Sequence, residues 1–317
     1  MLRAIPGAYP ARTFLRLVNF RQTVRRLPTQ TLYHEPNNIL KPFDGPSIIT
    51  VHDLSHLHYP DFHPRERVRF LERELPRSLA KATHIITDCE VIRRELITLL
   101  GVDPQCITAI HLGVSEQYYP RNRTETRAVL DKYGLTHQSY LLAVSTLEPR
   151  KNLAGLVRNY LRLPDIIRKR TPLVIVGGAG WRDARLQKML DRSEALGQLR
   201  RLGYVHAQDL PVIYAGAKAF AFPAFYEGFG LPPLEAIASG VPVLTSEKTA
   251  MAEVIGDSAA FLVTPDNDES LYAGLEQLLC DEKTGRIKIQ QGLKRAKYLG
   301  WSQCIEKTID LYQRVAS

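Results

Sequence analysis

The chain has 317 residues, of which 44% are hydrophobic and 24% are charged, and its formal net charge is +9. This balance is typical of a folded globular protein with enough residues for two cores of ordinary domain size, and it excludes intrinsic disorder. No apolar run approaches the ~20 residues that span a bilayer, and the start lacks the apolar stretch of a signal peptide, so we expect a cytoplasmic protein.

A basic amphipathic segment over residues 1–34 is the first predicted element. It holds six arginines and no acidic residue, and apolar side chains are interleaved with the arginines. Such a segment suits the surface of an anionic membrane, although an ordinary helix with a basic face would show the same pattern. The overall charge would equally fit nucleic acid or a phosphorylated substrate.

Short β-branched apolar runs then alternate with longer amphipathic segments. We predict strands over residues 47–51, 84–87, 107–111, 140–145, 173–176, 202–205, 219–222, 241–245 and 260–263. We predict helices over residues 65–81, 90–100, 151–161, 182–196, 208–216, 232–239, 268–281 and 284–298. Apolar strands separated by helix-length segments favour parallel sheets covered on both faces, the doubly wound α/β class.

The polar segment 118–139 separates three predicted strands from six and is the best candidate for a linker. We therefore predict one domain over residues 1–130, a second over 131–300, and a C-terminal helix over 301–317 that packs back on the first. Ligands bind beyond the carboxyl ends of the strands in such sheets, so the loops that follow strands are where chemistry is expected.

Metal sites and disulfides are not expected. The four cysteines lie far apart with no CxxC spacing, which favours buried reduced thiols. A dense polar cluster over residues 52–63 fits no zinc spacing. A strand followed by a loop would also splay its side chains apart. The cluster consists of His52, Asp53, His56, His58, Asp61 and His63. The acidic triplet 266–268 is better explained as a helix cap than as a metal motif.

The segment that follows the predicted strand 219–222 carries the strongest signal for ligand binding. Gly228 and Gly230 permit a tight loop, and two prolines fit the first turn of the next helix. The N–H groups of that turn, from Phe229 to Leu231, are a ready site for a diphosphate or for sugar hydroxyls.

Two carboxylates flank this turn, Glu227 in the loop and Glu235 in the helix. Both can border one pocket and accept hydrogen bonds from paired hydroxyl groups. A purely structural interpretation stays open, in which the helix dipole favours Glu235 and the glycines only form the turn.

A second segment, 145–153, follows the first strand of the second domain. Its adjacent Arg150 and Lys151 supply a planar fork and a point charge, which together suit a diphosphate leaving group. No metal is then needed to neutralise that group. The alternative is a solvated basic pair at a helix start, where the helix dipole disfavours cations.

These two segments resemble a known family. Glu-Gly-Phe-Gly-Leu-Pro-Pro-Leu-Glu over residues 227–235 resembles the E-x7-E signature of family 4 retaining glycosyltransferases of the GT-B fold. Thr-Leu-Glu-Pro-Arg-Lys-Asn-Leu over residues 146–153 resembles their donor-phosphate loop. The similarity extends through residues 50–54, 85–90, 111–114, 173–177, 202–205 and 253–257. The subgroup it resembles most builds O-antigen and exopolysaccharide repeat units with mannose.

The resemblance implies two Rossmann-like domains that face a cleft, and a role for each matching residue. Glu227 would hold the hydroxyls of the transferred hexose and Glu235 the ribose, while Arg150 and Lys151 would hold the diphosphate. Backbone N–H groups of the Gly228–Leu231 turn would complete the donor cradle, with His52 beside the transferred sugar. Catalytic roles thus fall to Glu227 and His52, and no protein nucleophile is implied.

The function implied is metal-independent, retaining transfer of a hexose, with mannose the first choice, to a polyprenyl-linked or glycan acceptor in cell-surface glycan synthesis. GDP-mannose or another nucleotide-diphosphate sugar would be the donor, without a further cofactor. The enzyme would be cytoplasmic and peripheral at the inner membrane face, with no nucleic-acid partner.

Three positions depart from the family pattern. The glycine-rich loop expected near the N-terminus is not visible in residues 1–30, so we expect a shortened first domain. Cys89 to Ile92 replace a serine-containing pattern, and Ser145 replaces a glycine. A non-catalytic nucleotide-sugar-binding or scaffold protein that lost this loop is therefore the alternative.

Overall fold

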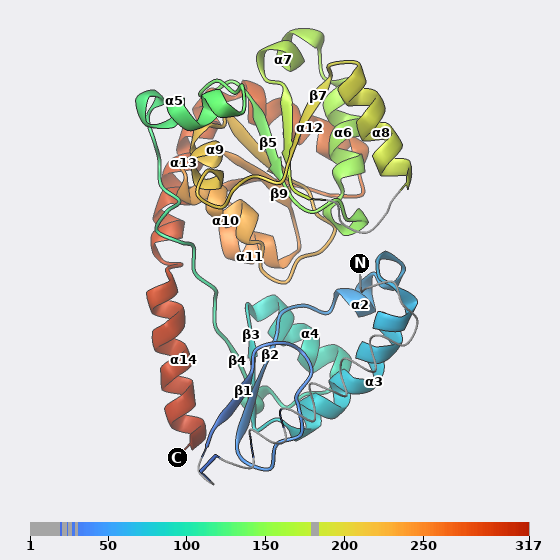
Figure 1. Ribbon diagram of the computed structural model, residues 1–317, viewed down its shortest axis with the longest axis vertical. Coiled ribbons are helices and arrows are strands. Elements are labelled where there is room, and N and C mark those ends of the chain that lie inside the picture. The colour runs from blue at the N-terminus through green and yellow to red at the C-terminus, as the bar shows by residue number, and fades with distance from the viewer. Residues whose placement is uncertain (1–19, 21–23, 25–26, 29–30, 179–183, 317) are drawn as a thin grey trace. The chain divides into compact units, whose positions relative to one another are not determined.

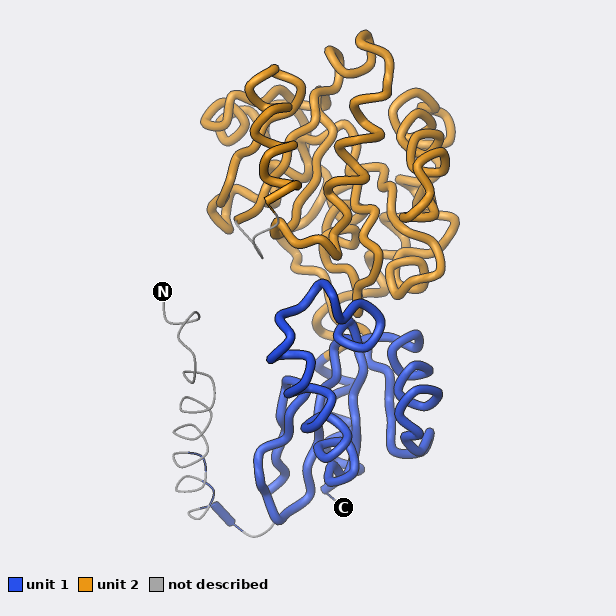
Figure 2. Tube along the Cα trace, turned by 90° about the vertical axis from the view of Figure 1, so that its right-hand side faces the viewer, with its two compact units in different colours: residues 1–110, 305–317 blue, residues 111–304 orange. Residues whose placement is uncertain are grey.

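The computed structural model describes residues 20, 24, 27–28, 31–178 and 184–316. It divides into two compact units, Met1–Ile110 with Ile305–Ser317 (unit 1) and His111–Cys304 (unit 2), which Figure 2 colours separately. Each unit contains one parallel sheet, which confirms the two predicted α/β domains. The six arginines of the basic segment 1–34 lie outside the described residues. Within the described part of the chain, no helix is both long and apolar enough to cross a membrane.

Unit 1 is built on a four-stranded sheet of order β1-β2-β3-β4 (Figure 1). Its strands are β1 (Tyr33–Glu35), β2 (Ser47–Val51), β3 (His84–Thr87) and β4 (Ile107–Ala109). Over residues 31–110 its helices are α2 (Ser55–His58), η2 (Pro60–Phe62), α3 (Arg65–Lys81), α4 (Glu90–Leu100) and η3 (Pro104–Cys106). Apolar side chains of β2 and β3 form one buried cluster with Leu75 and Leu79 of α3 and Leu96 of α4. Burial of this cluster holds the carboxyl ends of β2 and β3 in a fixed register.

The last helix, α14 (Trp301–Ala316), begins in unit 2 and ends in unit 1. In unit 1 the hydroxyl of Tyr312 lies 2.6 Å from Nδ1 of His34 in β1. Nε2 of the same histidine lies 2.8 Å from the hydroxyl of Thr50 in β2. The final turns of α14 are therefore tied to the sheet of the first unit by a chain of side-chain hydrogen bonds.

Unit 2 is built on a six-stranded sheet of order β10-β9-β8-β5-β6-β7. Its strands are β5 (Leu141–Val144), β6 (Leu173–Val176), β7 (Leu199–Gly203), β8 (Ala219–Phe222), β9 (Val243–Ser246) and β10 (Ala260–Val263). Its helices are α5 (Arg123–Lys132), η4 (Pro149–Lys151), α6 (Leu153–Arg162), α7 (Asp165–Arg170), α8 (Ala184–Ala195), α9 (Leu210–Gly216), α10 (Leu231–Ala238), α11 (Ala250–Ile255), α12 (Asp268–Cys280) and α13 (Glu282–Lys297).

Helices cover both faces of the unit 2 sheet (Figure 1). On one face, α6, α8 and α12 share a continuous buried core with alternate residues of the strands, including Leu141, Ile175 and Phe261. On the other, α10 packs on β8 and β9 and is itself covered by α13. Because every central strand is buried on both sides, its residues are almost all apolar, and this is why these strands were readable in the sequence.

The segment that we interpreted as a polar linker contains a helix, α5. Asn122 accepts hydrogen bonds from the N–H groups of Thr124 and Glu125, and the Glu125 carboxylate accepts one from the N–H of Asn122. This capping box explains why a strongly polar stretch still forms a helix. Residues 111–130, which we had placed in the first domain, belong to unit 2, where α5 packs on α9.

Candidate donor site in unit 2

The strand order of unit 2 reverses beside β5. From β5 the chain proceeds to β6 and β7 on one side, and then returns to place β8 against the other side of β5. Loops that leave the carboxyl ends of two such strands diverge to opposite faces and leave a crevice, where open α/β sheets bind their ligands. The segments with Arg150 and with Glu227 are the two loops at this switch point.

The loop after β5 forms the short 3₁₀ turn η4 and then α6. Asn152 has a left-handed backbone (φ 53°), and its side chain accepts a hydrogen bond from the N–H of Gly155 at the start of α6. The carbonyl oxygen of Arg150 accepts a hydrogen bond from the N–H of Phe225, 2.9 Å away. The two loops of the switch point are therefore linked through their backbones.

The loop after β8 ends at Gly230, which is the N-cap of α10 with φ 93° and ψ 56°. A Cβ atom there would lie 2.6 Å from Cγ of Met251 in α11. Glycine is thus required both by the left-handed backbone and by the close approach of α11. Its neighbour Phe229 is buried, and its ring centroid lies 6.0 Å from that of His111.

Substitution of Gly230 by alanine is expected to destabilise unit 2 by about 1–2 kcal/mol, since it forces a left-handed backbone on an L side chain and displaces Met251. Urea denaturation of the full chain measures this. Gly285→Ala, where an added Cβ meets nothing within 4 Å, is the matched control and should leave stability unchanged or slightly higher. Equal stability of the two variants would contradict the expectation.

Arg150, Lys151 and Glu227 converge into one ion cluster. Lys151 Nζ contacts Oε1 of Glu227, and Nη1 of Arg150 lies 3.2 Å from the same oxygen. Arg150 Nη1 also donates to the carbonyl of Tyr226 at 2.7 Å. The three side chains are only 12–13% exposed, so their charges are poorly screened by water. A second carboxylate, that of Glu148, lies 3.8 Å from Nη2 of Arg150. Two cations thus share the carboxylate of Glu227 at the switch point, and the formal charges of these four side chains balance.

Two cations held side by side fit an anionic ligand better than a metal ion. A diphosphate could take the place of the carboxylate on both cations, which would free Glu227 to accept hydrogen bonds from hydroxyl groups. Ser145, the first residue after β5, adds a buried hydroxyl with no hydrogen-bond partner among the residues described. A buried polar group of this kind is satisfied when a ligand reaches it.

Glu235 lies in α10, where its side chain interacts with two tyrosines. Burial raises the pKa of Glu235 to about 7, while the hydroxyls of Tyr214 and Tyr118 act in the opposite direction. The rings of these tyrosines meet edge to face with centroids 5.5 Å apart. Neither tyrosine stood out in the sequence, because residues 118 and 214 meet Glu235 only in the folded unit.

The raised pKa of Glu235 predicts a pH-dependent stability. The folded protein retains the proton between about 4.5, the ordinary pKa, and about 7, whereas the unfolded chain has lost it. The stabilisation of the fold by protonated Glu235 is therefore fully present below its ordinary pKa of about 4.5. It is lost as pH rises through about 7, the pKa in the folded protein. Glu235→Gln removes this loss, so the variant should gain on the order of 1–2 kcal/mol over the native chain between pH 5 and pH 8, discounted for partial exposure.

Urea denaturation of native chain and variant at both pH values measures the effect of Glu235→Gln. Glu276→Gln, at an exposed position of α12, is the control and should show no pH-dependent difference. A constant stability difference between Glu235→Gln and the native chain would contradict the assigned pKa.

His52 lies in unit 1, at the first position after β2. Its Nδ1 lies 2.8 Å from Oδ2 of Asp88, and its Nε2 lies 2.9 Å from the carbonyl oxygen of Pro36. Asp88 is the first residue after β3, and the register pairs Val51 with Thr87. The sequence analysis named His52 but missed Asp88. Asp88 follows β3 directly, as His52 follows β2, so its position at a strand end could have identified it.

Four other polar residues of segment 52–63 lie close enough for their charges to interact, namely Asp53, His56, His58 and His63. Burial lowers the pKa of His56 to about 4, and His58 lies 3.3 Å from Glu95. In the described residues, no group of three or more His, Cys, Asp or Glu side chains could hold a metal ion. The predicted cap at residues 266–268 is confirmed, because Asn267 accepts hydrogen bonds from the first N–H groups of α12.

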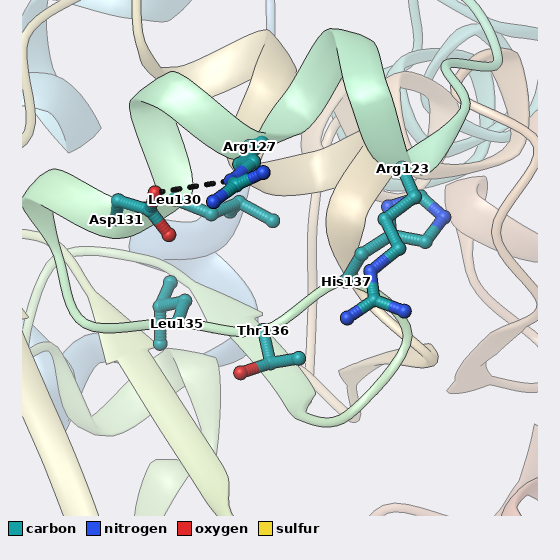
Figure 3. A pocket seen from close by; sticks show the side chains of 7 residues that line it. All are labelled: Arg123, Arg127, Leu130, Asp131, Leu135, Thr136 and His137. Carbon is teal, nitrogen blue, oxygen red and sulfur yellow. Dashed lines mark ion pairs between the residues drawn. The ribbon is translucent and has the colours of Figure 1, made fainter.

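A hollow lies on unit 2, beside α5 (Figure 3). It is lined by Arg123, Arg127, Leu130, Asp131, Leu135, Thr136 and His137. Residues 135–137 precede β5, so this hollow lies toward the amino end of that strand, away from the edge at which α/β sheets bind ligands. None of the predicted site residues lines it.

Two family models match the chain. Glycosyl transferases group 1 matches residues 125–295, and Glycosyltransferase Family 4 matches residues 12–118. The chain therefore belongs to the group 1 glycosyltransferases, which confirms the family predicted from its two loop motifs.

Known relatives agree with this assignment. The O-antigen chain mannosyltransferase B of Escherichia coli is 40% identical over 282 residues, 89% of this chain and 74% of that protein. The serotype-specific mannosyltransferase WbdA of Escherichia coli is 28% identical over 243 residues, 74% of this chain but only 29% of that protein. WaaG, a glycosyltransferase involved in lipopolysaccharide biosynthesis, has a TM-score of 0.78 at 17% identity, and the match covers 97% of this chain and 84% of that one. The fold is GT-B.

Proposed function

We propose that this protein is a retaining glycosyltransferase that moves mannose from a nucleotide-diphosphate sugar, GDP-mannose as the first choice, to a lipid-linked or polysaccharide acceptor in cell-surface glycan synthesis. The observation that carries the proposal is the Arg150–Lys151–Glu227 cluster at the switch point of unit 2. The choice of mannose rests on the 40% identity to an O-antigen chain mannosyltransferase that the chain covers over 74% of its length.

In this proposal each side chain of the cluster takes part in donor binding. Arg150 and Lys151 would bind the diphosphate, since a planar fork and an ammonium group together neutralise a leaving group whose charge grows in the transition state. Glu227, released from both cations, would accept hydrogen bonds from hydroxyls of the hexose. The first turn of α10 would add the backbone N–H groups of Gly228, Phe229, Gly230 and Leu231, and Glu235 would bind the ribose.

Acceptor deprotonation would fall to the departing phosphate itself, as front-face retention requires. The carboxylate of Glu227 is paired with two cations in the structure, which makes it a poor nucleophile. Catalysis would then rest on positioning the acceptor and stabilising the departing charge. No metal or further cofactor enters this scheme.

A peripheral location at the inner membrane face is part of the proposal. Five arginines of α3 are exposed, and they outnumber its three glutamates. They are Arg65, Arg67, Arg69, Arg73 and Arg77. Glu74 pairs with the last two, at 2.6 and 3.2 Å. The remaining positive charge would attract anionic lipid at moderate ionic strength.

The test combines a binding screen with a transfer assay on the full chain. Thermal shifts are measured with GDP, UDP and their sugars, because a bound ligand raises apparent stability by mass action. Transfer of labelled mannose to a polyprenyl-diphosphate glycan is then measured, and the anomeric configuration of the product is read by NMR. Stabilisation by GDP-mannose with retained configuration is expected. Stabilisation without transfer would favour the non-catalytic alternative, and no stabilisation by any nucleotide would defeat both.

A further inference from the structure

The hydrogen bonds of His52 fix its protonation state. The carbonyl of Pro36 can only accept, so Nε2 of His52 must carry a proton. Nδ1 faces the carboxyl of Asp88 at 2.8 Å, and that contact needs one further proton between the two groups. A carboxyl is a stronger acid than an imidazolium by more than two pK units, as ordinary values of about 3.9 and 6.5 show, so this proton belongs to the histidine.

The surroundings of the pair favour this arrangement. Asp88 is almost fully buried, with its side chain 4% exposed, whereas the side chain of His52 is 44% exposed. A buried carboxylate is stable when a cation is paired with it, and the imidazolium supplies that cation. The strand register holds the pair together, because His52 and Asp88 directly follow the paired residues Val51 and Thr87.

We propose that Asp88 is a positioning residue that keeps His52 as an imidazolium. His52 then serves the reaction as a cationic hydrogen-bond donor and not as a general base. This inference rests on the proposed function. Both ring nitrogens then donate and neither can take a proton from the acceptor. Nε2–H, at the exposed edge of the ring, is the group that would meet an oxygen of the reacting sugar in place of the Pro36 carbonyl.

Neighbouring titratable groups raise the pKa of His52 or oppose its positive charge only weakly. The hydrogen bond to Asp88 raises the pKa of His52, burial lowers it, and the charge of Asp53 in the next position raises it further. His34 in β1 is the cation that could oppose the pair, but burial lowers the pKa of His34 and favours its neutral form. The imidazolium should therefore persist to a higher pH than that of an ordinary histidine, and it should be lost as pH rises through the raised pKa.

The experiment is a titration of the histidine side chains by ¹⁵N NMR in the full-length native chain, with the His52 signal assigned from its loss in His52→Gln. Both ring nitrogens of His52 should stay protonated to a higher pH than the ordinary midpoint of about 6.5. Asp88→Asn should move the midpoint down by about one pH unit or more, as expected when an opposite charge is removed. Asp53→Asn is the control and should move it much less.

A midpoint at or below the ordinary value in the native chain would overturn the inference, and this reading does not require that Asp88→Asn folds. In transfer assays, the alkaline limb of the kcat profile should move to lower pH in Asp88→Asn, while GDP binding in unit 2 stays unchanged. If Asp88→Asn lowered the rate but left the pH profile unchanged, Asp88 would have only a structural role. Because the NMR titration needs no turnover, failure of the proposed function and failure of this inference are separable.

Discussion

Glu227→Ala is expected to abolish sugar transfer, a loss of at least about 100-fold, while the chain remains folded. The carboxylate accepts from both cations of the cluster, and in the proposed complex it is the group that holds the hexose hydroxyls. Transfer is measured with labelled donor, and folding by circular dichroism. Glu276→Ala, which removes an exposed carboxylate from α12, is the matched control and should transfer at the native rate.

The same variant separates donor binding from chemistry. Without Glu227, the diphosphate no longer competes with a carboxylate for Arg150 and Lys151, so the affinity for GDP should be equal to the native value or tighter. Glu227→Gln, which keeps the volume of the side chain, repeats the test should the alanine variant unfold. Native transfer rates in either variant would remove Glu227 from the proposed role.

Arg150→Ala should weaken GDP binding by about 10- to 100-fold, in line with the 1.5–3 kcal/mol that hydrogen bonds to charged groups contribute. Two losses combine here, the guanidinium contact with the diphosphate and the 2.7 Å bond that holds the carbonyl of Tyr226 in the loop after β8. Arg150→Lys retains the charge but not the planar fork of the guanidinium. Its affinity for GDP should therefore fall between those of the native chain and of Arg150→Ala.

Titration calorimetry with GDP measures these affinities. Lys248→Ala is the control, because it removes a cation whose side chain is 86% exposed in the same unit. An affinity for GDP that is the same in Arg150→Ala as in the native chain would refute the assignment of Arg150 to the diphosphate.

The strands were the most predictable part of the fold. The bounds of β2, β3, β6, β8 and β10 agree with the sequence-based ranges to the residue, because a strand buried on both faces is a short apolar run between polar ends. The prediction missed β1, which has three residues, two of them polar, and owes its place to pairing with β2. It also missed α5, where the capping box was present in the sequence but the polar composition outweighed it.

The site was predictable to the extent that it depends on loops after strands. Arg150, Lys151 and Glu227 could be named from residue types, but their convergence requires that β5 and β8 be neighbours, which no local pattern shows. The tyrosines around Glu235 come from residues 118 and 214, far apart in the chain, so their effect on its pKa could not be foreseen. Asp88 was within reach, since it occupies after β3 the position that His52 occupies after β2.

The central claim is that the crevice between the loops after β5 and β8 receives a diphosphate. A crystal structure of the full chain grown with GDP examines this most directly. We predict that phosphate oxygens will lie within hydrogen-bonding distance of both Arg150 and Lys151, with the carboxylate of Glu227 released from them. GDP bound elsewhere, for instance in the hollow beside α5, with the three-residue cluster intact, would contradict the account.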